Sequence, residues 1–446
     1  MTPSSSADAG SSRIPARPVR RRGRTGVPIP ALGLTLLVGA ATAGPSLAAE
    51  GDFVWNTELR EIYSQNVQRI GGEGGEDDVI SSLTATAEMR FRTPRSESAF
   101  GYTPELLKYA QFTEFDHLDH HESARWLVRP GERSEFQIRQ GFSLSSRQVG
   151  FADLAGAGGG PGQPVTARTE RTVWDFEPHW TFHPVALHTF QLGALARSES
   201  YGGDTPAVGG GGFIDSEQVG LQAQYDLPLG RSQTLGGRIK GDRYRFSQDE
   251  TAIESGAYDQ FFNLGVSWSL RHPGTFDLSG SAGAYRASGQ GVDNVLKPTA
   301  DLAGTWQWIR KALRLAYILG YSSGGGLTTS EQSQSVSVNY NVTSAQGWFF
   351  GTSGSTLRRR PLNEALLQNG TVTVTQGGDT LYGYHADVSI GRQWRTGIAL
   401  SATAGYLHQQ ESAGGGEIND LHFMEGSVGL RYTPPAPPPR PARPTT

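Results

Sequence analysis

Residues 79–91 read Val-Ile-Ser-Ser-Leu-Thr-Ala-Thr-Ala-Glu-Met-Arg-Phe, and this stretch decides the fold class. Every second residue from Val79 to Phe91 is apolar or small, and the residues between them mostly carry hydroxyls or charges. A period of two is the pattern of a strand with one apolar face and one polar face. The run exceeds the ~5–6 residues of an average soluble strand and suits the ~9–11 residues of a tilted membrane strand. It therefore predicts a membrane-spanning β-strand.

The same alternation recurs along most of the chain. It is clear over 136–144, 219–225, 262–270, 315–321, 336–340 and 398–404. After residue 50 the chain has no run of the ~18 or more apolar residues that a transmembrane helix needs. A mean hydropathy of −0.41 is compatible with a barrel, because lipid-facing and lumen-facing residues cancel in the average.

The connections between these runs alternate between short and long from residue 122 to Tyr432. Short turns are predicted near 130–133, 184–186, 228–232, 272–274, 310–311, 344–347 and 395–396. Short periplasmic turns alternating with longer outer loops are typical of outer-membrane barrels. This rhythm gives fifteen strands, and 52–62, 79–92 and 100–115 add three. The predicted fold class is all-β, a transmembrane antiparallel up-and-down β-barrel of about 18 strands, with 16 as the alternative.

The two ends of the chain differ from the alternating part. Five arginines between Arg17 and Arg24, a largely apolar run over 27–43 and Ser46-Leu47-Ala48 predict a signal peptide over residues 1–48. The barrel is predicted over 49–432 and a Pro-rich disordered tail over 433–446. Export followed by insertion would place the protein in the bacterial outer membrane, with outer-membrane lipid as a partner.

Composition excludes several classes of partner and chemistry. Removal of residues 1–48 takes away six Arg and one Asp, which changes the net charge from −4 to −9. A negative chain is a poor ligand for nucleic acid, so no nucleic-acid partner is expected. The chain has no Cys, which excludes disulfides and thiolate metal sites.

Aromatic residues near the strand ends suit two interfacial girdles. The predicted girdle residues are Trp55, Trp126, Trp174, Trp180, Trp268, Trp306, Trp308, Trp348, Trp394 and Tyr432.

Three groups of residues could bind a metal ion or an anion. Asp116-His117-Leu118-Asp119-His120-His121-Glu122 could hold Zn²⁺ or Ni²⁺, but a polar loop between strands explains it better because no more distant ligand is implied. Glu73, Glu76, Asp77 and Asp78 could bind Ca²⁺ weakly, and a polar outer loop is again the better explanation. Arg358-Arg359-Arg360 could face lipid phosphates or an anionic polymer, or could be solvated. No metal site and no cofactor are predicted.

Catalysis is disfavoured. A barrel-embedded hydrolase needs a nucleophile with a His base on neighbouring strands. His385 and His408 lie on predicted strands with Ser389 and Ser401 nearby in sequence, but polar wall histidines are much more common. The chain is therefore predicted not to be an enzyme.

The polar phase of the strands supplies the candidate functional residues. A wall of mixed charges and amides suits a hydrated passage or contacts with carbohydrate. The candidate lumen and polymer-contact residues are Glu88, Arg90, Arg92, Glu135, Gln137, Arg139, Gln222, Gln224, Arg238 and Lys240.

The first 90 residues of the predicted mature chain resemble a group of outer-membrane β-barrels from bacterial exopolysaccharide export loci, including exosortase-associated and Wzx-Wzy-type systems. The matching features are Tyr63-Ser64-Gln65-Asn66-Val67, Asp78-Val79-Ile80, Tyr102, Lys108-Tyr109 and Phe115-Asp116-His117-Leu118-Asp119-His120. The resemblance covers about a fifth of the chain. It implies a conduit for a cell-surface or secreted polysaccharide, with a periplasmic polysaccharide-export protein as partner, and it carries no catalytic residues. The alternatives are a general or small-solute porin and, with less support, a barrel-embedded lipid hydrolase.

Overall fold

The computed structural model describes residues 50–65, 76–145, 170–185, 188–202, 215–247, 257–272, 274–289, 295–322, 331–361, 380–412 and 418–434. All of them belong to the compact unit Glu50–Thr446. The predicted signal peptide over 1–48, the candidate calcium ligand Glu73 and the tail beyond Pro434 lie outside the described residues. Among the residues that are described, no helix has the length and apolar character to span a membrane.

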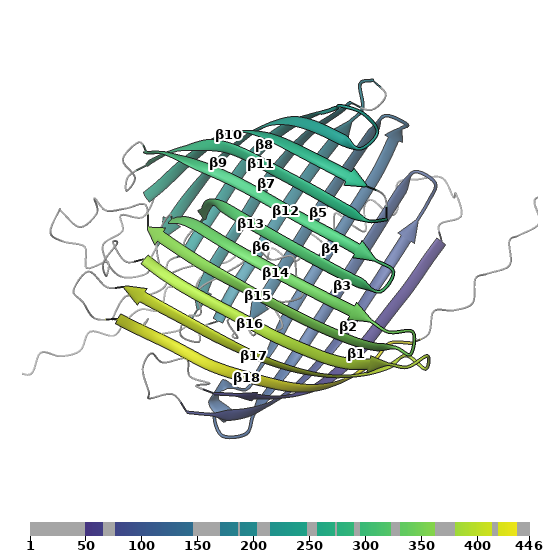
Figure 1. Cartoon of the computed structure of the whole chain (residues 1–446), viewed down its shortest axis with the longest axis vertical. Helices are drawn as coiled ribbons and strands as arrows, with labels where there is room; N and C mark the ends of the chain where they lie inside the picture. The colour runs from purple at the N-terminus through teal and green to yellow at the C-terminus, as the bar shows by residue number, and fades with distance from the viewer. Residues whose placement is uncertain are drawn as a thin grey trace, which may run out of the picture. The chain divides into compact units, whose positions relative to one another are not determined.

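The described chain forms one antiparallel sheet of 18 strands that closes on itself. Successive strands are neighbours, as can be followed in Figure 1, and the pairing of β1 with β18 completes the ring. The strands are β1 (Glu50–Ser64), β2 (Asp78–Arg92), β3 (Ser96–Tyr109), β4 (His117–Gly131), β5 (Ser134–Ser145), β6 (Glu170–Phe182), β7 (Thr189–Gly202), β8 (Asp215–Pro228), β9 (Gln233–Ser247), β10 (Ala257–His272), β11 (Phe276–Gly289), β12 (Val295–Trp308), β13 (Lys311–Ser322), β14 (Glu331–Thr343), β15 (Trp348–Pro361), β16 (Thr380–Gln393), β17 (Ile398–Ser412) and β18 (Ile418–Tyr432). The predicted fold class and the larger of the two strand numbers are confirmed.

The short turns share one end of the barrel, which also holds the start of β1 and the end of β18. Gly347 (φ 82°) and Gly397 (φ 88°) sit in two of these turns, in a backbone region that favours glycine. The N–H of Gly347 donates a hydrogen bond to the carbonyl oxygen of Ser344, and that of Gly397 donates to the carbonyl oxygen of Trp394. In outer-membrane barrels the end with short turns is periplasmic, so the start of β1 and the end of β18 lie on the periplasmic side.

The region between β2 and β4 differs from the predicted strand over 100–115. Thr93 bonds to Ser96 through both its backbone N–H and its hydroxyl, so the chain turns early and β3 begins at Ser96. After Tyr109 the chain leaves the sheet and forms a single 3-10 turn, η1 (Thr113–Phe115). The strand β4 then starts at His117, inside the cluster that was expected to be a loop.

The strand β1 pairs over a shorter stretch with β18, which closes the barrel, than with β2. The strand β1 pairs with β2 over its whole length, from Glu50–Arg92 to Ser64–Asp78. It pairs with β18 only from Thr57–Tyr432 to Ser64–Glu425. The first residues of β1 therefore hydrogen-bond to one neighbour.

Candidate functional site in the barrel lumen

One face of the closed sheet is apolar and accessible. Leu221 is 68% exposed, Leu264 57% and Val428 55%, and the register places such residues side by side on successive strands. In water these side chains would form one large exposed apolar surface, whereas a closed barrel in a bilayer presents them to lipid and satisfies all backbone groups internally. The protein is an outer-membrane β-barrel.

Of the ten predicted girdle residues, only Trp174 lies towards the extracellular end, so these residues form one girdle and not two. Trp308 ends β12 and Trp348 begins β15, and of the nine Trp residues only Trp174 lies in the extracellular half of its strand. Exposed arginines occupy outward positions at the extracellular ends instead. They are Arg243, Arg245, Arg286, Arg358 and Arg360.

The other face lines the lumen, and all ten predicted lumen residues lie on it. On each strand these residues alternate with the exposed apolar residues and therefore point to the opposite face. The register shows this for Glu88, Gln137, Gln222 and Lys240, and the other six have the same alternation. Whether any of them contacts a polymer stays a prediction.

Most charged lumen residues are neutralised within the wall. Arg90 Nε lies 2.5 Å from Glu88, Arg129 Nε lies 3.1 Å from Glu135 and Lys240 Nζ lies 2.9 Å from Asp242. Arg92 lies 3.8 Å from Glu97. The pairs on β2 and β9 join residues two apart on one strand, which project from the same face. The wall is therefore highly polar with little net local charge at these positions.

Gln137 has a different environment. It is flanked by Arg125 on β4 and Arg139 on its own strand, β5. With its amide oxygen turned towards them, it accepts a hydrogen bond of 2.8 Å from the Nε of each arginine. Both arginines are exposed, and no described carboxylate lies within ion-pair distance of either.

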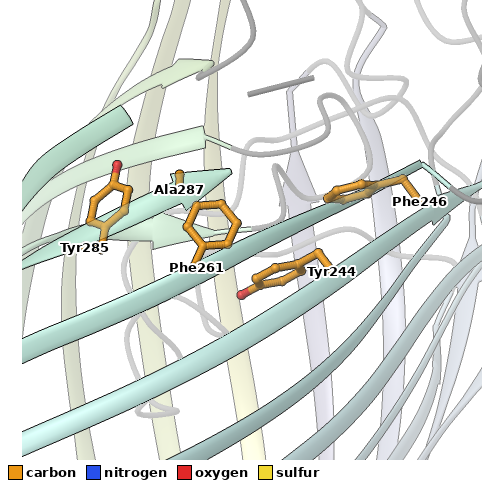
Figure 2. Packing of buried hydrophobic residues seen from close by; sticks show 5 residues of the cluster. All are labelled: Tyr244, Phe246, Phe261, Tyr285 and Ala287. Atoms are coloured by element: carbon orange, nitrogen blue, oxygen red, sulfur yellow. The ribbon is translucent and has the colours of Figure 1, made fainter. Parts of the chain in front are cut away.

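An aromatic cluster lines the lumen at the extracellular ends of β9, β10 and β11. Figure 2 shows its members, Tyr244, Phe246, Phe261, Tyr285 and Ala287, all of which are at most 5% exposed. Tyr321 joins them from β13, with its ring stacked 4.3 Å from that of Phe261. The pairing of β12 with β13 ends at Ala300–Leu319, so the end of β13 that carries Tyr321 pairs only with β14.

Asp242 connects this aromatic cluster to the charged wall. Its carboxylate is 4% exposed and accepts hydrogen bonds from Tyr321 Oη at 2.6 Å and from Gln218 Nε2 at 3.0 Å, besides its ion pair with Lys240. A buried carboxylate is stable only when its oxygens are satisfied in this way. Asp242 therefore fixes the relative positions of three strands.

A second inward cluster lies at the extracellular ends of β1, β2 and β3. It consists of Ile62, Ile80, Leu107 and Tyr109, and Phe112 and Phe115 pack against it. The segment 110–116, which we call the strap, therefore folds over lumen-facing residues. The strap makes this contact although it is short, because its phenylalanines lie directly beside the wall.

Two carboxylates anchor the strap. Asp78, 2% exposed, accepts hydrogen bonds from the backbone N–H groups of Gln111 and Phe112 at 3.1 Å each. Asp116 accepts from Lys108 Nζ at 2.7 Å and from the Tyr109 N–H at 2.8 Å. The hydrogen bond from Lys108 and then that from the Tyr109 N–H hold the pKa of Asp116 below its usual range.

The His-rich stretch is divided by the alternation of β4. His117 and Asp119 face the lumen, where His117 Nε2 lies 3.2 Å from Asp119, while His120 faces outward and its Nδ1 lies 2.8 Å from the Tyr102 hydroxyl. Adjacent ligands in a strand point to opposite faces and cannot meet on one ion. No group of three His, Asp or Glu side chains suited to a metal occurs within the described ranges.

The arginine triplet and the residues weighed for catalysis are divided in the same way. Arg359 faces the lumen and pairs with Glu331 at 2.8 Å, both nearly buried, whereas Arg358 and Arg360 face outward. His385 and Ser389 face the lumen, and His408 faces outward beside Tyr384. A cross-strand nucleophile and base pair does not form among these residues.

Sequence reasoning missed Arg125 and the aromatic cluster, although both had a signal. Arg125 has the same phase as Arg139 in the paired strands, and Tyr244 and Phe246 continue the phase of Arg238 and Lys240. Apolar residues in the lumen phase near a strand end were the sign of inward packing. Tyr321 had no such signal, because its alternation places it outward.

Comparisons with known proteins give similarity of fold alone. No family model matches the chain, and no curated protein matches it. Among solved structures, Pseudomonas aeruginosa OccK2 (OpdF), crystallised with glucuronate, is 11% identical with a TM-score of 0.45 and covers 86% of this chain and 99% of its own. The P. aeruginosa outer-membrane protein OpdK is 11% identical with a TM-score of 0.42, covering 86% and 98%. P. aeruginosa OccD3 (OpdP) is 12% identical with a TM-score of 0.41, covering 85% and 91%.

Proposed function

We propose that the barrel is a water-filled passage for hydrophilic molecules across the outer membrane, of the small-solute porin type. The observation that supports this most is the sidedness of the sheet. Lumen-facing side chains such as Ser123, Arg125 and Asp301 are exposed, and their neighbours are amides, hydroxyls and paired charges. A protein that only anchored itself in lipid would have no need of this wall.

The polar wall fits passage better than it fits catalysis. The strands β14 and β15 present small polar residues inward, among them Ser337, Asn339 and Ser353. Small hydroxyl and amide side chains exchange hydrogen bonds with water and with passing polar groups at little cost. They leave room in the lumen and favour no single covalent chemistry.

Conductance tests this function. The protein, purified and inserted into planar bilayers, is expected to give stepwise increases of ion current in KCl. Liposomes that contain it are expected to swell in solutions of small sugars. Insertion without current or swelling would contradict the proposal. A barrel with Ser353→Trp and Ser337→Trp, two bulky side chains that narrow the lumen, is expected to conduct less while folding normally.

A polysaccharide conduit is the second candidate. It is supported by the sequence resemblance of the first 90 residues of the predicted mature chain and by the many hydroxyl and amide groups of the lumen, which suit a sugar chain. Its partner would be a periplasmic polysaccharide-export protein. Deletion of the gene would then remove polymer from the cell surface and leave small-solute permeability unchanged. The porin function predicts the reverse, with normal polymer and slower solute uptake.

A further inference from the structure

We propose that Arg125, Gln137 and Arg139 form a binding site in the lumen for an oxyanion, a carboxylate or a phosphate group carried by a solute. The inference deepens the proposed function, because it names a class of solute that the passage would favour. It depends on the proposed function only for the route by which the solute arrives.

The two guanidinium groups are held side by side. Arg125 on β4 is directly opposite Arg139 on β5, and both project into the lumen. Side chains at opposite positions of an antiparallel pair start with Cβ atoms ~4.5–5.5 Å apart. The Gln137 oxygen accepts from the Nε of each arginine at 2.8 Å, which orients both groups. The Nη hydrogens of both groups stay available, in the planar arrangement that matches carboxylate and phosphate oxygens.

The pair lacks the neutralising carboxylate that several other lumen cations have. Arg90 and Arg129 each have a carboxylate within 3.1 Å. Arg125 and Arg139 have Gln137 instead, and an amide carries no charge. Like charges at opposite positions destabilise a sheet. Binding of an anion between the two guanidinium groups would remove this repulsion, so the arginine pair is expected to attract negative charge.

The carboxylates on the neighbouring strand have other contacts. Glu177, opposite Arg139 on β6, lies 3.6 Å from His179 Nε2. Asp175 lies over Gly141, where an added Cβ would meet its Oδ1 at 2.6 Å. Gly141 therefore lets the Asp175 carboxylate approach the β5 backbone instead of the arginines. On the other side Ser123 is exposed and adds a hydroxyl next to Arg125 on the same face.

The test uses the whole barrel in planar bilayers and in detergent. The variant is Arg125→Gln with Arg139→Gln. The matched control is Glu88→Gln with Arg90→Gln, which removes one cation and one anion from the same lumen and keeps its net charge. Two readouts are taken: the chloride-to-potassium permeability ratio in a KCl gradient, and calorimetric titration of the detergent-solubilised protein with inorganic phosphate and with succinate.

The wild-type barrel and the control are expected to prefer chloride and to bind one or both titrants. The arginine variant is expected to lose anion preference by about threefold or more and to bind about tenfold more weakly, as for loss of a charged hydrogen bond. Binding of phosphate without succinate would assign a phosphate-bearing solute, and the reverse a carboxylate. Equal binding by wild type and arginine variant, or none by either, overturns the inference. A barrel that binds through these arginines but carries no current would contradict the proposed function alone.

Discussion

The two inward apolar clusters of the barrel differ in what packs on them and in what their buried carboxylates bind. The cluster of β9, β10 and β11 is made of strand residues whose rings pack on one another, and its buried carboxylate, Asp242, binds side chains. The cluster of β1, β2 and β3 is covered by the strap, and its buried carboxylate, Asp78, binds backbone N–H groups. The first cluster fixes neighbouring strands to one another. The second fixes a connecting segment to the wall.

This difference predicts which cluster affects the whole barrel and which affects only its own region. Loss of a ring or a charge at the β9–β11 cluster is expected to lower global stability. Loss of a hydrogen bond at the strap is expected to release residues 110–116 locally and leave the strands intact, because local opening draws on the least stable part of a structure.

The largest effect is expected for Phe261→Ala. Phe261 is 2% exposed and its ring contacts those of Tyr321 and Tyr244. Truncation of a buried Phe costs about 3–5 kcal/mol. Urea unfolding of the folded barrel, followed by its shift in gel mobility, measures the loss. Phe262→Ala is the matched control, because Phe262 is 53% exposed on the lipid face. Equal losses for the two variants would show that the cluster does not stabilise the barrel.

Asp242→Asn is expected to have the next largest effect. The variant leaves Lys240 without its ion pair and weakens the hydrogen bond from Tyr321, a loss of about 1.5–3 kcal/mol. The same urea unfolding measures it. Asp277→Asn serves as the control, because its pair with Arg271 is exposed and such pairs contribute about 0–1 kcal/mol. If both variants unfolded alike, the Asp242 network would have no special role.

Asp78→Asn tests the strap and is expected to act locally. Asn has a single acceptor oxygen and no charge, so the N–H groups of Gln111 and Phe112 lose part of their bonding. Their amide hydrogens are expected to exchange about tenfold faster, equivalent to about 1.4 kcal/mol. Hydrogen exchange read by NMR checks this, with amides of β10 as internal reference. Faster exchange in β10 as well would mean that the strap supports the entire barrel.

The smallest effect is a pH dependence of the strap. The pKa of Asp116 is depressed by Lys108 and the Tyr109 N–H, so its contribution is complete above the ordinary Asp pKa and is lost as pH falls through the depressed value. The Tyr109 amide resonance is expected to shift only in that acidic window. Lys108→Met should move the midpoint upwards, and Asp116→Asn should abolish the shift. A midpoint unchanged by Lys108→Met would contradict the role of the lysine.

Strand alternation made the fold and the lumen set predictable, and it failed where the chain leaves the sheet. The phase that begins at Val79 assigns Glu88 and Arg90 to the lumen, because a strand has no other way to place them. The strap could not be predicted, since it depends on two aspartates that accept hydrogen bonds from backbone N–H groups 7 and 33 residues away in the sequence. Tyr321 escaped prediction because it lies beyond the last β12–β13 pair, and there its ring stacks on Phe261 although the alternation places it outward.

The short pairing of β1 with β18 has a consequence for how the barrel assembles. The two strands are the first and last of the sheet, and their contact joins residues from opposite ends of the chain, so this joint can form only after the rest of the polypeptide has been synthesised. Contacts of such high sequence separation are slow to form, and an open sheet edge pairs readily with other chains until it closes. The joint is therefore expected to close last, and until it closes the edge of β1 must be kept from pairing with other chains.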